Sequence, residues 1–265
     1  MIYSGNLFKM STENKQFVQY TLSLGEDKIL MNNLINKTIR FKYNGIINCI
    51  YCGRQTKTSF SQGFCYPCFQ SVPEADPAII KPELDMSHKG ISRDMEWAKK
   101  HSLVEHFVYL AFSSNIKVGV TRCSQIPTRW IDQGANKAII LAKTPYRNLA
   151  GQIEVAMKKF FADKTNWRKM LSNVSCNNNL LLEAKDEALE NFPIEFEEYF
   201  FNDNSITEIN YPVNKYPEKI KSISLDKLPE FEKKLVGIKG QYLIFDDNYV
   251  MNIRKHNGYS VELEF

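Results

Sequence analysis

The chain has 265 residues, 43% of them hydrophobic, which is enough for two or three compact units with a buried core. No run of about 18 apolar residues occurs, which excludes a membrane-spanning helix, and the polar first positions argue against a secretory signal. The net charge of +4 excludes little, but four of the six cysteines form two Cys-x-x-Cys pairs, which favours a metal site in a reducing cytoplasm over disulfides.

The charge is unevenly distributed along the chain. Residues 81–170 carry 16 basic and 8 acidic side chains, whereas residues 171–234 carry 7 and 13. All three tryptophans, Trp97, Trp130 and Trp167, lie in the basic block. A basic segment that carries aromatic residues suits a polyanionic partner such as DNA or RNA. The alternative is that the acidic block neutralises the basic one within the fold.

The first 48 residues are typical of β-structure. Strands are expected over 3–10, 17–24 and 38–43, with turns at residues 25–27 and 44–45. Three further strands are expected at the other end of the chain, over 235–245, 249–254 and 259–265. Because each set is too short to close a barrel alone, we expect residues 1–48 and 235–265 to pair into one barrel-like unit.

The next segment, residues 49–70, has the pattern of a zinc ribbon. Each Cys-x-x-Cys pair presents two sulfurs from a tight turn, and four thiolates complete a tetrahedral shell around Zn²⁺. Such a shell leaves no open position, so the metal is expected to be structural. Redox dithiols and free cysteines are the alternatives. The predicted ligands are Cys49, Cys52, Cys65 and Cys68.

Two further segments flank the central part of the chain. Residues 71–104 are expected to be a proline-containing connector with a helix over 93–100, and residues 176–234 an acidic helical segment followed by a linker. The remaining cysteines, Cys123 and Cys176, are interpreted as small buried apolar residues.

Residues 105–175 are expected to form a β-β-α-β-α unit that begins with a hairpin. If residues 113–115 are the loop, Tyr109 lies opposite Gly119. Tyr109, Lys117 and Gly119 then share one face with Ala111 and Thr121, because strand side chains alternate. The opposite face, with Ile116, Val118 and Val120, is assigned to the core. Since glycine has no side chain, the face over Tyr109 is expected to be open. An ordinary half-buried hairpin is the alternative interpretation.

The rest of this unit is expected to contain a short helix over 124–135, a strand over 138–142 and a longer helix over 148–162. Arg129 lies on the first helix. Glu154 lies at the edge of the apolar stripe of the second, where Lys158, four residues later, can pair with it.

The order and residues of this unit resemble the GIY-YIG nuclease domain. VYL at 108–110 looks like its first motif and KVG at 117–119 like its second. Arg129, Glu154 and Asn166 fall where that family keeps an arginine, a metal-binding glutamate and a late asparagine. The resemblance covers residues 105–170. It implies phosphodiester hydrolysis in which Glu154 holds Mg²⁺ or Mn²⁺, Tyr109 helps activate water, Arg129 neutralises the scissile phosphate, and Asn166 orients the helix or substrate.

One residue departs from the family pattern. Lys117 stands where the second motif has a tyrosine. A lysine can hold a phosphate or, with a lowered pKa, assist proton transfer, and it can equally mark a domain that binds without cutting.

Over nearly its full length the chain also resembles an uncharacterised family with a domain of unknown function, through CIYCGR, GFCYPCF, KVGVTR, PTRWIDQGA, DKTNWRKML and GIKGQYLIF. The fold class predicted is therefore α+β: a GIY-YIG-like unit, a four-cysteine zinc ribbon and a β-rich barrel-like unit. Three functions stay open: a metal-dependent endonuclease, a nucleic-acid-binding protein without activity, and a zinc-held protein-interaction scaffold.

Overall fold

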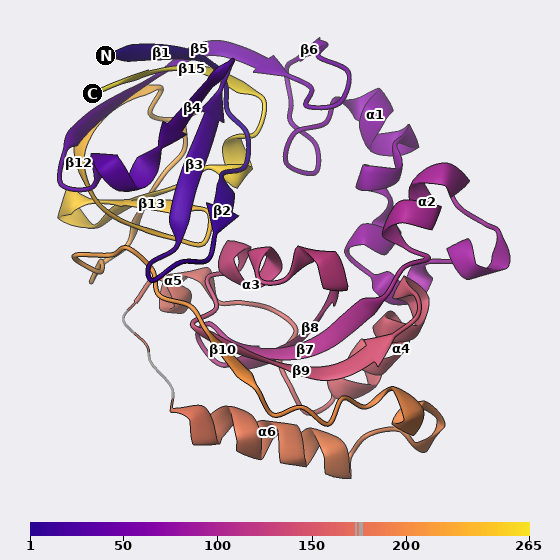
Figure 1. The fold of residues 1–265 in the computed structure, drawn as a ribbon. Helices are drawn as coiled ribbons and strands as arrows, with labels where there is room; N and C mark the ends of the chain where they lie inside the picture. Colours follow the sequence, from indigo (N-terminus) through magenta and orange to yellow (C-terminus); the bar gives the residue numbers. More distant parts are fainter. Residues whose placement is uncertain (173, 175–176) are drawn as a thin grey trace. The chain divides into compact units, whose positions relative to one another are not determined.

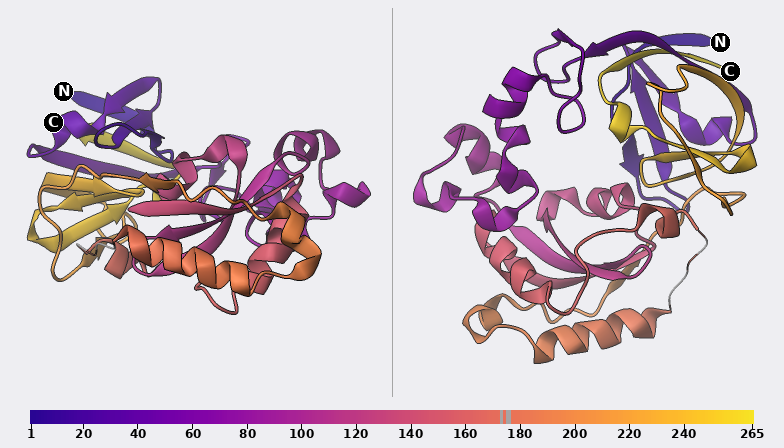
Figure 2. Two further views of the ribbon diagram at one scale, coloured as in Figure 1. Left: turned by 60° about the horizontal axis from the view of Figure 1, so that its bottom comes forward. Right: turned by 180° about the vertical axis from the view of Figure 1, so that it is seen from behind.

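The computed structural model describes residues 1–172, 174 and 177–265, so the interpretation of Cys176 lies outside the described residues. The fold is mixed α+β and divides into two compact units (Figures 1 and 2). Unit 1 consists of Met1–Gln70 and Asn210–Phe265, and unit 2 of Ser71–Ile209. Unit 1 is thus built from both ends of the chain and unit 2 from its middle.

The main sheet of unit 1 combines strands from the two ends of the chain. Its order is β1-β15-β5-β12-β13-β14-β11, and β6 also pairs with β5. Neighbouring strands are antiparallel except β11 and β14. The strands are β1 (Ile2–Asn6), β5 (Thr38–Asn48), β6 (Gln55–Thr56), β11 (Lys221–Ile223), β12 (Glu230–Lys239), β13 (Tyr242–Phe245), β14 (Tyr249–Asn252) and β15 (Tyr259–Glu264).

The prediction of a barrel-like unit is wrong, because this sheet is open and has β1 and β11 as its two edge strands. Residues between β1 and β5 form a separate three-stranded sheet of β2 (Ser11–Glu13), β3 (Gln19–Leu24) and β4 (Asp27–Leu30), followed by the 3₁₀ helix Met31–Leu34. In β3, alternate residues are buried, including Tyr20, Leu22 and Leu24. These strands pair with one another in a separate sheet and do not extend β1 into a closed ring.

Unit 2 is built on a four-stranded antiparallel sheet of order β10-β9-β7-β8. Strands β7 (His106–Phe112) and β8 (Ile116–Arg122) form the predicted hairpin, and the predicted register, with Tyr109 opposite Gly119, is confirmed. Strand β9 (Lys137–Thr144) is longer than predicted, and β10 (Ile206–Glu208) was not anticipated. The order β7, β8, α3, β9, α4 is the expected one.

Helices cover both faces of this sheet, with α3 and α6 on opposite sides in Figure 1. Helix α3 (Thr128–Asp132) follows a 3₁₀ turn at Cys123–Gln125, and Cys123 itself is only half-buried. Helix α4 (Arg147–Met157) ends earlier than predicted because the following chain turns to pair Ala162 with strand β8. The others are α5 (Trp167–Met170), α6 (Asn178–Glu190) and the 3₁₀ helix Ile194–Tyr199.

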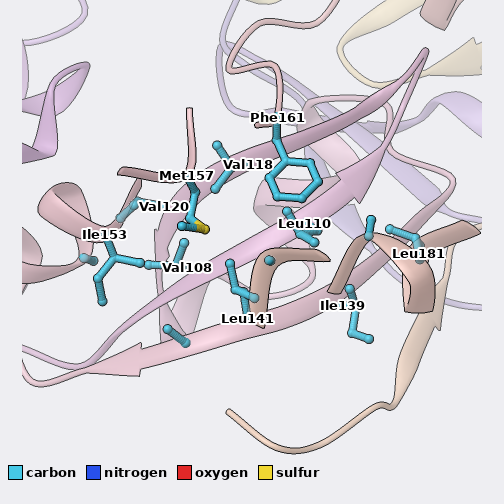
Figure 3. Packing of buried hydrophobic residues seen from close by; sticks show 14 residues of the cluster. Val108, Leu110, Val118, Val120, Ile139, Leu141, Ile153, Met157, Phe161 and Leu181 are labelled. Atoms are coloured by element: carbon cyan, nitrogen blue, oxygen red, sulfur yellow. The ribbon is translucent and has the colours of Figure 1, made fainter. Parts of the chain in front are cut away.

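The hydrophobic core of unit 2 lies on the α4 and α6 face of the sheet (Figure 3). Val118 and Val120 of β8 pack there with Ile153 of α4 and Leu181 of α6, and Ile116 packs against them. The prediction that Ile116, Val118 and Val120 face the core is therefore confirmed. Trp130 of α3 packs on the opposite face, which carries Tyr109, Lys117 and Gly119.

The segment that precedes β7 is not an irregular connector. It forms four 3₁₀ turns, Pro73–Ala75, Pro77–Ile79, Pro82–Leu84 and Ser87–Lys89, and then helix α2 (Met95–His101). Proline opens the first three turns because its fixed φ suits a first helical position. The turn Pro82–Leu84 packs directly against α4. In the part of the chain that is described, no helix has the length and apolar character needed to cross a bilayer.

Candidate functional site

Four cysteines of unit 1 form a compact cluster. The sulfur atoms of Cys49, Cys52, Cys65 and Cys68 all lie within 4.8 Å of one another, and three of these residues are buried. Among the described residues this is the one group of three or more His, Cys, Asp or Glu side chains able to hold a metal ion. The two Cys-x-x-Cys pairs, separated by twelve residues of sequence, therefore meet in space as predicted.

Local backbone structure holds each pair in place. Cys49 follows β5, and its N–H donates to the carbonyl of Arg54 while Gly53 donates back to Cys49. Gly53 has a φ of 71°, which a glycine adopts without strain. Cys65 directly precedes helix α1 (Tyr66–Ser71), and Cys68 lies one turn into it. The second pair thus sits at a helix start and not in a second tight turn.

The geometry of the cluster fits a metal ion such as zinc. In a tetrahedral shell with Zn–S bonds of about 2.3 Å, sulfurs lie about 3.8 Å apart. The Cys52 and Cys65 sulfurs are 3.8 Å apart, which is too far for a disulfide. Burial opposes ionisation of the Cys49 thiol, but hydrogen bonds from the backbone N–H groups of Cys52, Cys65 and Tyr51 and from the Cys52 side chain together lower its pKa to about 6. Burial raises the pKa of Cys68.

The second candidate site lies in unit 2 and is centred on the sheet face opposite the core, with one residue, Glu154, coming from α4 on the core face. Its centre is Gln133, which follows α3: its Oε1 atom accepts hydrogen bonds from the Tyr109 hydroxyl at 2.9 Å and from Lys117 Nζ at 2.6 Å. The charges of Arg129 and Glu154 act on both Tyr109 and Lys117. We call these five residues the Tyr109 cluster.

The sequence-based expectation of an open face over Tyr109 is wrong. The space above Gly119 is occupied by the Tyr109 ring itself, since a Cβ atom at residue 119 would lie 2.7 Å from the Tyr109 hydroxyl. Trp130 of α3 packs edge-on against the same ring. Tyr109 is consequently 0% exposed, and Lys117 is 3% exposed. Gly119 therefore makes room for the Tyr109 ring, which leaves no space for a ligand at this position.

Burial changes the proton affinity of the two donors. Desolvation and the nearby Arg129 guanidinium lower the pKa of Lys117 to about 7, although the Glu154 carboxylate opposes them. Desolvation raises the pKa of Tyr109, while Arg129 and the hydrogen bond to Gln133 oppose the rise. A lysine that is half-neutral near pH 7 can accept a proton, whereas an ordinary surface lysine cannot.

Glu154 of α4 is the acidic member of the cluster and is 8% exposed. Its burial raises its pKa, which Lys158 lowers and Glu83 and Asp163 raise further. The Oε2 atom lies 3.3 Å from Lys158 Nζ, the predicted pair, but accepts no hydrogen bond of good geometry among the described residues. Glu154 is thus a buried carboxylate with one ion pair, to Lys158, and with the further charges of Glu83 and Asp163 acting on it.

The fifth residue suggested by the resemblance, Asn166, has a different environment. It is exposed, and its Oδ1 atom caps α5 by accepting from the N–H groups of Arg168 and Lys169. No hydrogen bond among the described residues joins it to the Tyr109 cluster. Its place at the start of a helix fits a role in orienting that helix.

Sequence reasoning missed Gln133, although this residue holds Tyr109 and Lys117 together. A glutamine carries no charge, and although Gln133 lies within PTRWIDQGA, one of the motifs shared with the uncharacterised family, it was given no role there. That motif and the position of Gln133 one residue before Gly134, where the short helix was expected to stop, are the signals that pointed to this end of α3.

Comparison with known proteins identifies the chain at the level of a family. The family model DUF2797, described as a protein of unknown function, matches residues 36–261. No curated protein and no solved structure matches the chain.

Proposed function

The chain belongs to the DUF2797 family, and we propose that it is a zinc-ribbon protein that binds nucleic acid and cleaves its phosphodiester backbone with the Tyr109 cluster of a GIY-YIG-like unit. The observation that carries this proposal is the convergence on Gln133: Tyr109 and Lys117 donate to one oxygen atom within range of Arg129 and Glu154. The zinc ion in the four-cysteine cluster is structural, because four thiolates leave no open coordination position.

Each residue of the cluster has a defined task in this chemistry. Gln133 holds the Lys117 amine and the Tyr109 hydroxyl in fixed positions, and Tyr109 helps to activate the attacking water. The neutral Lys117 amine accepts a proton from the attacking water, and Arg129 neutralises charge on the scissile phosphate. Glu154 is the residue that would hold Mg²⁺ or Mn²⁺, and such an ion supplies stabilisation of the leaving oxygen when bound. Asn166 orients α5 beside the site.

A non-catalytic nucleic-acid-binding protein is the second candidate. The burial of Tyr109 and Lys117 favours it, because a phosphate reaches them only if the chain that covers them moves aside. A zinc-held scaffold for protein interactions is the third, and it requires no salt-dependent nucleic-acid binding.

Glu154→Gln tests the proposal. We expect the wild type, with Mg²⁺ or Mn²⁺, to cleave at least one member of a labelled panel of single-stranded, duplex and branched DNA and structured RNA. Glu154→Gln should reduce the cleavage rate by about 100-fold or more while binding persists, because the carboxylate acts on the transition state. The control is Glu96→Gln, which removes an exposed carboxylate of α2 and should leave the rate unchanged.

The other outcomes separate the candidates. Binding without cleavage across the panel would refute the nuclease and leave the non-catalytic protein. Absence of both binding and cleavage would refute both and favour the scaffold.

The pH dependence of cleavage should report Lys117. Its pKa is lowered to about 7, so the amine is protonated and inactive as a base below that pH and neutral above it. We therefore expect the single-turnover rate to rise up to about tenfold per pH unit below pH 7 and to level off above it. Lys117→Met should remove this rise and slow cleavage, whereas Lys143→Met, at a half-buried lysine paired with Glu105, should keep it. A rise retained in Lys117→Met would assign the titration to another group.

A further inference from the structure

The strongest unassigned surface of unit 2 is the segment between α4 and the end of α5. Residues 158–169 contain five basic side chains and one acidic one, and we call them the basic strip. Four of the basic residues are exposed and make no ion pair among the described residues, whereas Lys158 pairs with Glu154. The four are Lys159, Lys164, Arg168 and Lys169.

The strip is fastened along the outer edge of the sheet. Strand β8 is the edge strand, and its Val118 N–H donates to the carbonyl of Ala162 at 2.9 Å. The Ser113 and Thr165 hydroxyl groups, 3.3 Å apart, make a second attachment. The backbone of the strip is therefore held in place while its charged side chains remain in solvent.

The two ends of the strip lie next to residues of the Tyr109 cluster or their neighbours. It starts at Lys158, the ion-pair partner of Glu154, and passes Lys117 where Ala162 pairs with β8. Its far end leads into Met170, which is buried against Gly134, the neighbour of Gln133. A chain of phosphates that follows the strip would thus pass the cluster.

We propose that the basic strip binds the phosphodiester backbone of nucleic acid, with Lys159, Lys164, Arg168 and Lys169 contacting phosphates. This inference rests on the proposed function and adds the surface that positions the substrate. Charge complementarity favours nucleic acid as the ligand of this strip, because its four exposed cations make no ion pair among the described residues. Their backbone is held in place next to the Tyr109 cluster. Phe160 is 43% exposed within the strip and offers a ring to an unpaired base.

The test measures how binding depends on salt. The binding constants of a labelled single strand and a labelled duplex for the full chain would be measured without divalent ions. The salt concentration would be varied from about 50 to about 200 mM. Each phosphate contact contributes about 0.9 to the slope of log K against log salt on a duplex and about 0.7 on a single strand. Replacing the four strip residues by glutamine should therefore lower the slope by about 3.6 on a duplex or about 2.8 on a single strand.

A matched control removes the same charge elsewhere in unit 2. Four other lysines of unit 2 are also exposed: Lys81, Lys89, Lys99 and Lys100. Their replacement by glutamine should change the slope by less than the contribution of one phosphate contact. All eight side chains are exposed, so both variants should fold, which circular dichroism would verify.

The outcomes separate this inference from the proposed function. A wild type that binds neither probe would overturn both. A strip variant with an unchanged slope, or a control with an equal loss, would overturn the strip alone. A loss confined to the strip variant would support the strip even if the protein proves unable to cleave.

Discussion

Cys65→Ser is expected to abolish stoichiometric zinc binding and to unfold the segment around the cluster. The wild type should bind one zinc ion per chain, because four sulfurs within 4.8 Å of one another complete one tetrahedral shell. Binding of a structural zinc contributes about 10 kcal/mol, which the substitution would remove from this short segment. Metal content by mass spectrometry and hydrogen exchange would measure the two effects.

The hydrogen bonds of the cluster identify where exchange should increase. Protection should be lost at the amides of Cys49, Ile50, Gly53 and Phe64, whose N–H groups donate within the segment. The three tryptophans all lie in unit 2, so the unfolding transition reported by their fluorescence should move much less.

Cys123→Ser is the matched control, since Cys123 is a free cysteine outside the cluster. It should retain the zinc and the protection. Full zinc content in Cys65→Ser, or a wild type that contains no zinc after purification with zinc present, would contradict the assignment of the cluster as a zinc site.

Gly151→Ala is expected to destabilise unit 2 by about 3 kcal/mol, although alanine favours helices. A Cβ atom at residue 151 would lie 2.3 Å from the Glu83 backbone nitrogen and 2.5 Å from the Pro82 carbonyl carbon. These are backbone atoms of a 3₁₀ turn, so neither can rotate away as a side chain can. Urea unfolding followed by tryptophan fluorescence would measure the change.

A second effect should accompany the first. Separation of α4 from the turn Pro82–Leu84 would move Glu154, which lies in the next turn of the helix, so cleavage should also slow. Val155→Ala is the control, because Val155 is 42% exposed on the same helix and its replacement should change stability by less than about 0.5 kcal/mol. An unaltered urea midpoint in Gly151→Ala would contradict the prediction, because it would show that the turn Pro82–Leu84 can move away from the new methyl group at little cost in free energy.

The elements that sequence reasoning predicted well depend on neighbouring residues. The hairpin of β7 and β8 has a three-residue polar loop, which sets its register, and the alternation of Ile116, Val118 and Val120 sets its buried face. The cysteine cluster follows from the spacing of two short motifs. The family was likewise predicted from motifs distributed along the chain, and its match covers residues 36–261.

The elements that it predicted poorly depend on distant partners. The prediction of a barrel-like unit was wrong because residues between β1 and β5 form their own sheet. The alternation of apolar and polar residues does not distinguish one barrel from two separate sheets. The prolines at 73, 77 and 82 suggested irregular chain, yet they open 3₁₀ turns that pack as part of unit 2.

By itself, then, the sequence determined which side chains are available: four thiolates at ribbon spacing, and Tyr109, Lys117, Arg129 and Glu154 in a β-β-α-β-α order. Only the tertiary structure decided what surrounds them. Packing of α3 over the sheet brings Gln133 to Tyr109 and Lys117 and closes the face that Gly119 was expected to leave open. The physical reason is desolvation, which depends on all the chain that covers a group and lowers the pKa of Lys117 to about 7.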